Sequence, residues 1–231
     1  MKNIKKYLEK VRAIRKKKYH PLIHKIHKKH MLSKKTLFYI KEYGPHTNVS
    51  KTIIKESIKI LLIASIISAF GGLALEHVKT IFVSIIPLII LLPVLNDMIG
   101  DYGTIISSRF STMLYEGKVN KKWWAKEDIK VLFLQIFIIA IITAFISSLV
   151  ALILSGFSNY KINLIIALKI LLIALIDIIL LVSILFLIAV TAGLYLYRKK
   201  EDPNNFLIPI TTSLADFGNM VLLAVLVILF F

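Results

Sequence analysis

Apolar residues fall in long blocks along most of the chain, with short polar links between them. The runs at residues 60–75 and 164–190 carry few charges, which is typical of helices that cross a membrane and not of helices that cover a soluble core. The expected fold is therefore all-α, a polytopic membrane protein. Five transmembrane helices are predicted, at about Ser57–Leu75, Ile81–Leu114, Ile129–Leu154, Leu164–Tyr197 and Phe206–Phe231.

The second apolar region is too long for one straight span. At ~1.5 Å per residue it would measure about 50 Å, whereas the hydrocarbon layer of a bilayer is about 30 Å thick. It contains two prolines and a polar centre, at Pro87, Pro93, Asn96, Asp97, Gly100, Asp101 and Gly103. We expect a kinked or interrupted helix that continues into the cytosol.

Residues 1–56 form a basic, mainly polar cytoplasmic segment ahead of a transmembrane domain at residues 57–231. Early in this segment, apolar residues recur at the spacing of one helical face among lysines: Ile4, Leu8, Val11 and Ile14. This pattern predicts an amphipathic helix that lies on the membrane or against the rest of the protein. A cleavable signal peptide is not expected, because the segment before the first apolar run is long and polar.

The chain is strongly basic, with a formal net charge of +17, and the positions of its charges give an orientation. Of the 30 Lys and Arg residues, 18 lie in residues 1–59, and nearly all the others flank apolar spans. Residues 118–130 and 198–200 would share one side with the N-terminal segment, while the other side would carry only Lys79 and Lys161. Because basic loops stay in the cytoplasm, we expect the N-terminus inside and the C-terminus outside.

The same distribution of charge decides between classes of partner. Basic residues clustered beside a membrane bind anionic lipid headgroups, so membrane lipid is an expected partner and the cell (plasma) membrane the expected location. No nucleic acid partner is expected, because the chain shows no RNA-recognition motif, zinc finger or interleaved aromatic pattern. The chain has no cysteine, which excludes disulfides and thiolate metal sites. It also lacks a nucleophile elbow, a phosphate loop and an HExxH motif, so an enzyme is not expected.

Four carboxylates fall inside the predicted spans, at Asp97, Asp101, Asp177 and Asp216. A charge at the bilayer centre costs at least ~2.5–3.5 kcal/mol on insertion scales, so such residues usually face a cavity, a partner or an ion path. Arg109 is the only arginine near them, and internal ion pairs therefore cannot neutralise all four. Cations or protons must compensate the remaining charge.

The second and fifth spans contain the candidate ligands. Asp97 and Asp101 are four residues apart, on one helical face, and repel each other unless a cation or a proton lies between them. Asp216 lies ten residues into the fifth span, near the bilayer midplane. Further oxygen ligands beside these carboxylates are the Gly100 carbonyl, Thr212 and Asn219. An oxygen-only set suits Mg²⁺, which keeps several waters and needs only one or two carboxylates.

Asp177 and a row of four histidines have interpretations that do not involve the ion pathway. Asp177 has only aliphatic neighbours in sequence and is interpreted as a protonated, hydrogen-bonded packing residue, with an ion-coupling site as the alternative. Histidines recur on one predicted helical face at His20, His24, His27 and His30. They could bind a transition metal, but the surrounding lysines favour a solvated basic face.

Two segments of the chain resemble the MgtE family of magnesium transporters, and its eukaryotic solute-carrier branch most closely. Residues 93–112, PVLNDMIGDYGTIISSRFST, followed by Glu116 and Gly117, are similar to the second transmembrane helix of that family. Residues 202–216, DPNNFLIPITTSLAD, are similar to the start of its fifth helix. With both segments in the right order within five spans, the resemblance covers most of residues 57–231.

The resemblance implies a homodimer with a Mg²⁺-selective pathway lined by the second and fifth helices of both subunits. It implies that Asp216 holds a largely hydrated Mg²⁺ in the pore and that the segment around Gly100 and Asp101 lines the same path. Many relatives have Gly-Asn at that point, and the added carboxylate affects affinity and the preference for Mg²⁺ over Mn²⁺ or Co²⁺. Residues 1–56 are too short and too basic to match the regulatory domains of the bacterial proteins, so gating is expected to differ.

These observations leave three functions open. The leading prediction is a divalent-cation (Mg²⁺) channel or transporter that is driven by the membrane potential. The first alternative is a Mg²⁺ antiporter coupled to Na⁺ or H⁺, with Asp177 or Asp97 as the coupling site. The second is a membrane interaction protein that transports nothing.

Overall fold

The computed structural model describes residues 49–119, 123–158, 160–199 and 203–231, and every regular element within these ranges is helical. The elements are α4 (Val49–His77), α5 (Lys79–Ser84), α6 (Ile86–Tyr115), the short 3-10 helix η1 (Trp123–Ala125), α7 (Glu127–Phe157), α8 (Leu164–Lys199) and α9 (Pro203–Phe230). The predicted amphipathic helix and the row of histidines fall before Val49 and lie outside the described residues.

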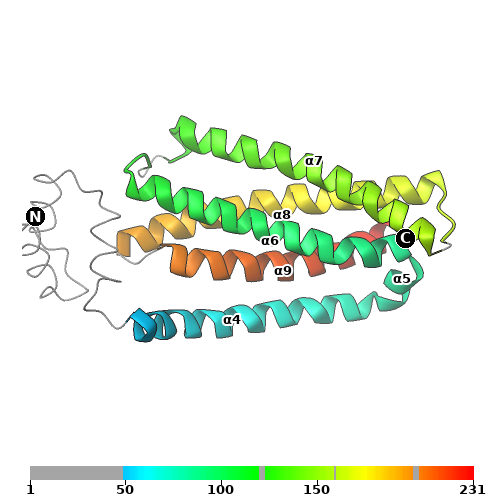
Figure 1. Ribbon diagram of the computed structural model, residues 1–231, viewed down its shortest axis with the longest axis horizontal. Helices are drawn as coiled ribbons and strands as arrows, with labels where there is room; N and C mark the ends of the chain where they lie inside the picture. Colours follow the sequence, from blue (N-terminus) through cyan, green and yellow to red (C-terminus); the bar gives the residue numbers. More distant parts are fainter. Residues whose placement is uncertain (1–48, 120–122, 159, 200–202) are drawn as a thin grey trace, which may run out of the picture.

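Five of these helices are long and apolar enough to cross a membrane, which confirms the predicted all-α fold with five spans. They are α4, α6, α7, α8 and α9, and they run side by side along the long axis of the molecule (Figure 1). About 20 residues suffice to cross a ~30 Å hydrocarbon layer. The longest of the five, α8, has 36 residues, so its ends extend beyond that layer. The chain is a multi-pass membrane protein.

The predicted interruption of the second span lies near its start. Ile85, with φ −115° and ψ 83°, separates the short α5 from α6. Pro87 occupies the first turn of α6, where a proline costs no helical hydrogen bond. Pro93 lies inside α6, which nevertheless continues as one α-helix of 30 residues. The polar centre around Asp97 and Asp101 is therefore helical.

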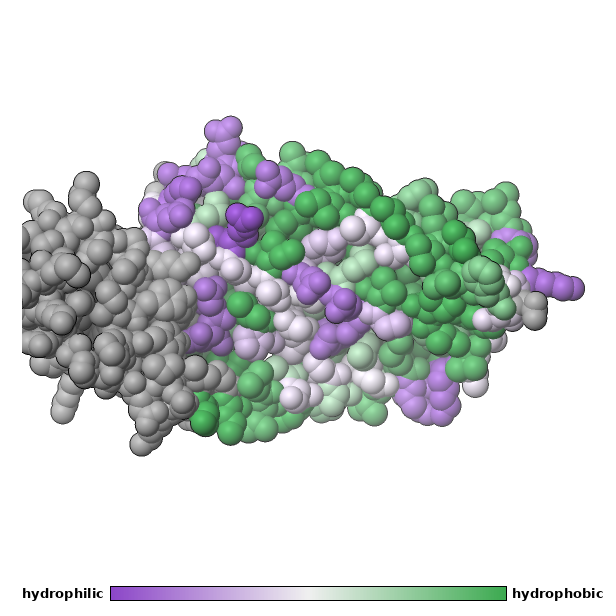
Figure 2. Space-filling view, viewed as in Figure 1, coloured by the Kyte–Doolittle hydropathy of each residue, from purple (hydrophilic) through white to green (hydrophobic). Residues whose placement is uncertain are grey.

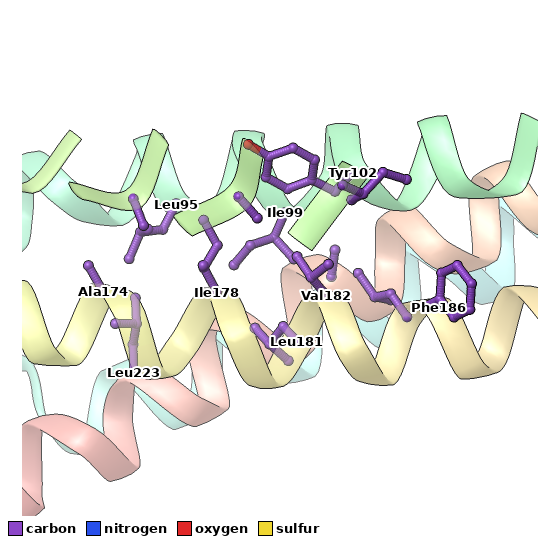
Figure 3. Close-up of a cluster of buried hydrophobic side chains, with 14 of the residues drawn as sticks. Leu95, Ile99, Tyr102, Ala174, Ile178, Leu181, Val182, Phe186 and Leu223 are labelled. Atoms are coloured by element: carbon purple, nitrogen blue, oxygen red, sulfur yellow. The ribbon is translucent and has the colours of Figure 1, made fainter. Parts of the chain in front are cut away.

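α8 is the most buried of the five spans and forms the centre of the bundle. It packs against α6, α7 and α9. Figure 3 shows Ile178 and Val182 of α8 beside Leu95 and Ile99 of α6, and none of these four side chains is exposed. Because lipid tails are as apolar as these side chains, close packing rather than exclusion of water holds helices together at this depth.

Small residues let α7 pack tightly on its neighbours. One face of α7 is buried at intervals of three or four residues by Ala140, Ala144, Ser148, Ala151 and Ser155. Side chains of this size let helix backbones approach each other closely in a membrane. The opposite face of α7 carries exposed Ile, Leu, Val and Phe side chains, which suit contact with lipid.

α4 packs mainly on α9. A Cβ atom at Gly71 would lie 2.9 Å from Met220 Sδ and 3.1 Å from Phe217 Cα, so only glycine permits this approach. The outer face of α4 exposes large apolar side chains, among them Leu62 and Phe70. Only 11% of its membrane-crossing window is buried, so α4 is an outlying helix attached to the bundle through one neighbour.

Candidate ion-binding site

Asp216 is half-buried in the middle of α9 and accepts hydrogen bonds from two other helices. Ser68 Oγ of α4 donates to Asp216 Oδ2 at 3.1 Å, and Asn96 Nδ2 of α6 donates to Asp216 Oδ1 at 2.7 Å. Among the described residues, no lysine or arginine forms an ion pair with Asp216. Neutral donors therefore orient this carboxylate without neutralising its charge.

Two glycines of α6 let α9 come close to it. A Cβ atom at Gly103 would lie 3.2 Å from Thr211 Cβ, and one at Gly100 would lie 3.7 Å from Thr212 Cγ2. Thr211 Oγ1 lies 3.2 Å from Ser107 Oγ, which links the same two helices. Thr212 is half-buried, and its hydroxyl donates to the carbonyl one turn earlier at 2.8 Å. The geometry thus explains Gly103 by packing, while Gly100 and Thr212 as ion ligands stay predictions.

The exposed side of α6 carries a line of polar side chains, which we call the α6 polar stripe. Its members recur every three or four residues with one adjacent pair, so they share a helical face. All are exposed or half-buried: Asp97, Asp101, Thr104, Ser108 and Arg109. Figure 2 shows hydrophilic surface that continues from the end of the bundle beside the grey residues into its middle, over α6 and α9. Because hydrocarbon excludes carboxylates, this surface must face water or protein.

The contact between α6 and α9 gives the relative depth of the carboxylates. Asn96 bonds Asp216, so Asp97, the next residue of α6, lies at about the level of Asp216. Asp101 follows one turn later, about 6 Å along the helix axis toward the end that carries Arg109. Asp97 and Asp101 are both exposed, and Asp216 is only half-buried. The structure thus leaves all three carboxylates outside dry packing.

Asn219 and Asp177 lie behind this surface. Asn219 is fully buried, and its Nδ2 donates to Asn96 Oδ1 at 3.0 Å. The other polar atom of the Asn219 amide lies 2.8 Å from Oδ2 of Asp177, a residue of α8 that is also fully buried. Asn219 is therefore joined to Asp216 through Asn96 and not directly, and its role as an ion ligand stays a prediction.

Sequence reasoning missed two residues that touch Asp216. Asn96 lies in the polar centre of the second span, and an uncharged amide beside Asp97 in mid-membrane is a signal from which a role could be predicted. Ser68 carries no such signal. A serine in an apolar helix can bond its own backbone, so its presence in the sequence does not indicate a tertiary contact.

One copy of the chain does not provide a closed cage for a bare cation. In the ranges that the structure describes, no three His, Asp or Glu side chains converge on one point. Asp216 instead offers one carboxylate among amide and hydroxyl groups. Such a sparse oxygen set fits an ion that keeps most of its water, as Mg²⁺ does.

The sequence was also compared with known proteins. A family model for MgtE, a divalent cation transporter, matches residues 92–226, which is more than half of the 231-residue chain. The chain belongs to the MgtE family. Comparisons with curated proteins and with solved structures gave no match. The matched region runs from α6 into α9 and contains every member of the α6 polar stripe as well as Asp177 and Asp216. Since MgtE proteins are transporters, membership agrees with the prediction that the chain is not an enzyme.

Proposed function

We propose that this MgtE-family protein is a Mg²⁺ channel or transporter in which two copies of the chain enclose the ion pathway. One observation carries the proposal. Asp216 is a half-buried carboxylate in mid-span with no cationic partner among the described residues, level with Asp97 on the exposed α6 polar stripe. A charge at this depth requires compensation, and a passing cation supplies it.

The second copy is inferred from the exposure of the stripe. A face with two carboxylates and an arginine cannot lie against lipid. A twofold-related copy would place two such stripes opposite each other, because symmetric dimers use the same surface patch on both subunits. The space between the stripes would then hold water and the ion, with α6 and α9 of both copies as its walls.

The choice of Mg²⁺ rests on the donor chemistry. The chain has no cysteine, and every polar side chain bonded to Asp216 ends in an amide or a hydroxyl. Hard cations select oxygen ligands, and Mg²⁺ holds its water more firmly than Ca²⁺ does. In this proposal Asp216 holds the hydrated ion, Asp97 and Asp101 attract it along α6, and Gly100, Thr212 and Asn219 add neutral oxygen atoms.

The membrane potential supplies a driving force for the flow of Mg²⁺. In a cell whose plasma membrane is negative inside, the potential drives Mg²⁺ inward whichever way the chain is oriented. It contributes ~2.3 kcal/mol per charge per 100 mV, and twice that for a divalent ion.

The test is Mg²⁺ flux into liposomes that contain the purified full chain. We expect Asp216→Ala to reduce flux by at least roughly tenfold, a change of ~1.4 kcal/mol, because it removes the carboxylate that offsets the charge of the ion in mid-membrane. Asp128→Ala is the matched control, since Asp128 is exposed at the start of α7 outside the site. Equal flux for the wild type and Asp216→Ala would reject the proposal and favour a non-transporting interaction protein.

The same liposomes separate a channel from an antiporter. A channel produces a current that follows voltage when no Na⁺ or proton gradient is present. An antiporter needs such a gradient. If flux required one, the protein would be an antiporter that exchanges Mg²⁺ for Na⁺ or H⁺ and not a channel.

A further inference from the structure

One charged member of the α6 polar stripe has no part in the proposed ion pathway. Arg109 is exposed on α6 and forms no ion pair with any residue that the structure describes. It follows Asp101 by eight residues, which places it about 12 Å further along the helix axis. A guanidinium group stays protonated, so Arg109 adds a fixed positive charge to a row of carboxylates.

The carboxylates nearest to Arg109 along α6 do not neutralise this charge. Asp101 lies more than two turns before it, and the two side chains form no ion pair. Glu116 lies seven residues after it, just beyond the end of α6, and its Oε2 accepts a bond from Lys118 Nζ at 3.0 Å instead. The charge of Arg109 is therefore available to act on a passing ion.

The depth of Arg109 places it at one mouth of the proposed pathway. Asp97 lies at about the level of Asp216, which is in mid-span, and Arg109 follows Asp97 by twelve residues, or about 18 Å along the axis. Half of a ~30 Å hydrocarbon layer is ~15 Å, so Arg109 lies just outside the hydrocarbon. An ion that crosses the membrane along the α6 polar stripe must pass Arg109 as it enters or as it leaves.

The proposed dimer places a second arginine at the same depth. Both copies insert with the same orientation, because the same basic loops stay in the cytoplasm. The twofold axis then runs along the membrane normal, and each residue of one stripe lies at the depth of the same residue in the other. Arg109 of each copy therefore faces the other Arg109, about 12 Å from the level of Asp101 in either copy.

We infer that Arg109 forms an electrostatic barrier at this mouth, which lowers the local concentration of Mg²⁺ and limits its flux. The inference rests on the proposed function, in which the stripes of two copies enclose the pathway. Fixed charges of one sign in a cleft change the local concentration of ions, and a divalent ion feels twice the repulsion of a monovalent one. Because an ion passes both mouths, the barrier acts on flux in either direction.

A charge series at this position tests the inference in liposomes that contain the purified full chain. Arg109→Lys keeps the charge, Arg109→Gln removes it and Arg109→Glu reverses it. At low Mg²⁺ concentration and low ionic strength, Arg109→Lys should stay within about twofold of wild-type flux and Arg109→Gln should exceed it roughly fivefold, the upper range for exposed charge interactions. Arg109→Glu should raise flux further. Both increases should shrink in high salt, because salt screens exposed charges.

Lys130→Gln is the matched control for loss of a positive charge. Lys130 is exposed at the start of α7, at the same end of the bundle as the end of α6 (Figure 1), and lies outside the α6 polar stripe. Its flux should equal that of the wild type. Unfolding temperatures in detergent show which variants are folded, and if Arg109→Glu does not fold, Arg109→Gln and Arg109→Lys decide alone.

The outcomes separate this inference from the proposed function. Unchanged flux in folded Arg109→Gln would overturn the barrier, and so would reduced flux, which would assign the arginine a structural role. If Asp216→Ala is inactive while Arg109→Gln matches the wild type, only the barrier fails. If Asp216→Ala transports normally while the charge series raises flux, the ion site at Asp216 fails and the barrier stands. If the wild type carries no Mg²⁺, both fail.

Discussion

At the scale of single residues, the candidate ion site combines a carboxylate that two hydrogen bonds hold in place with two carboxylates that are exposed on α6. Asp216 accepts hydrogen bonds from Ser68 and Asn96, so its position is fixed before any ion arrives. Asp97 and Asp101 are exposed on α6. Fixed groups give specific binding, whereas exposed charges mainly raise the local concentration of counter-ions.

This difference predicts a modest, salt-dependent role for Asp101. We expect Asp101→Asn to lower Mg²⁺ flux at low Mg²⁺ concentration by up to roughly fivefold, the upper range for exposed charge interactions. The effect should shrink in high salt, because ions screen exposed charges within about 10 Å at 0.1 M. Initial flux rates at two ionic strengths measure it, with Asp128→Asn as the control. An Asp101→Asn defect that is as large as that of Asp216→Ala and insensitive to salt would contradict this.

At the scale of helices, close approach of α6 and α9 brings the site residues together. Gly103 lies against Thr211, and the Ser107–Thr211 contact joins the same two helices one turn further along α6. The distance between the α6 polar stripe and Asp216 therefore depends on the absence of a side chain at Gly103.

We expect Gly103→Val to destabilise the protein by ~1–3 kcal/mol, the usual cost of overpacking, and to reduce flux by separating α6 from α9. Gly72→Val is the matched control, because a Cβ atom at Gly72 would meet nothing within 4 Å. Thermal unfolding in detergent and flux in liposomes measure the two effects. Equal unfolding temperatures for both variants would show that the α6–α9 contact is looser than the structure indicates.

Helix-level features were also the most predictable from the sequence. All five spans were predicted because apolar blocks of this length have few other structural solutions. The break in the second span was expected from its length, but its place at Ile85 depends on local backbone geometry. Asp216 was found because a charge in an apolar block is conspicuous. The hydrogen bonds of Asp216 to Ser68 and Asn96 could not be predicted from the sequence, since hydropathy does not show which faces of distant helices meet.

At the scale of the whole molecule, one copy leaves a charged surface where a membrane protein should have an apolar one. The α6 polar stripe lies on the outside of the bundle, while other exposed faces carry aliphatic side chains. The described chain is therefore interpreted as half of the transporting unit.

Cross-linking tests this arrangement directly. The chain contains no cysteine, so Ser108→Cys introduces a single thiol in the α6 polar stripe. We expect a short bifunctional thiol reagent to join two copies in liposomes. Ile139→Cys on the exposed face of α7 is the control and should stay uncross-linked. Efficient cross-linking of Ile139→Cys with none at Ser108→Cys would show that the subunits meet at α7 and not at the α6 polar stripe, which would contradict the proposed dimer.

α4 is the least buried of the five spans, and it also carries a hydrogen-bond donor to Asp216. The membrane-crossing window of α4, Ile60–His77, has 18 residues and is about 27 Å long, so its match to a ~30 Å hydrocarbon layer changes with acyl-chain length. Its Ser68 hydroxyl donates to Asp216, so we expect a shift of α4 that relieves a mismatch to alter a hydrogen bond of the proposed ion-binding carboxylate. Half-saturating Mg²⁺ should therefore vary between short-chain and long-chain lipids in wild type and hardly vary in Ser68→Ala. An equal variation in both would mean that lipid acts on transport elsewhere.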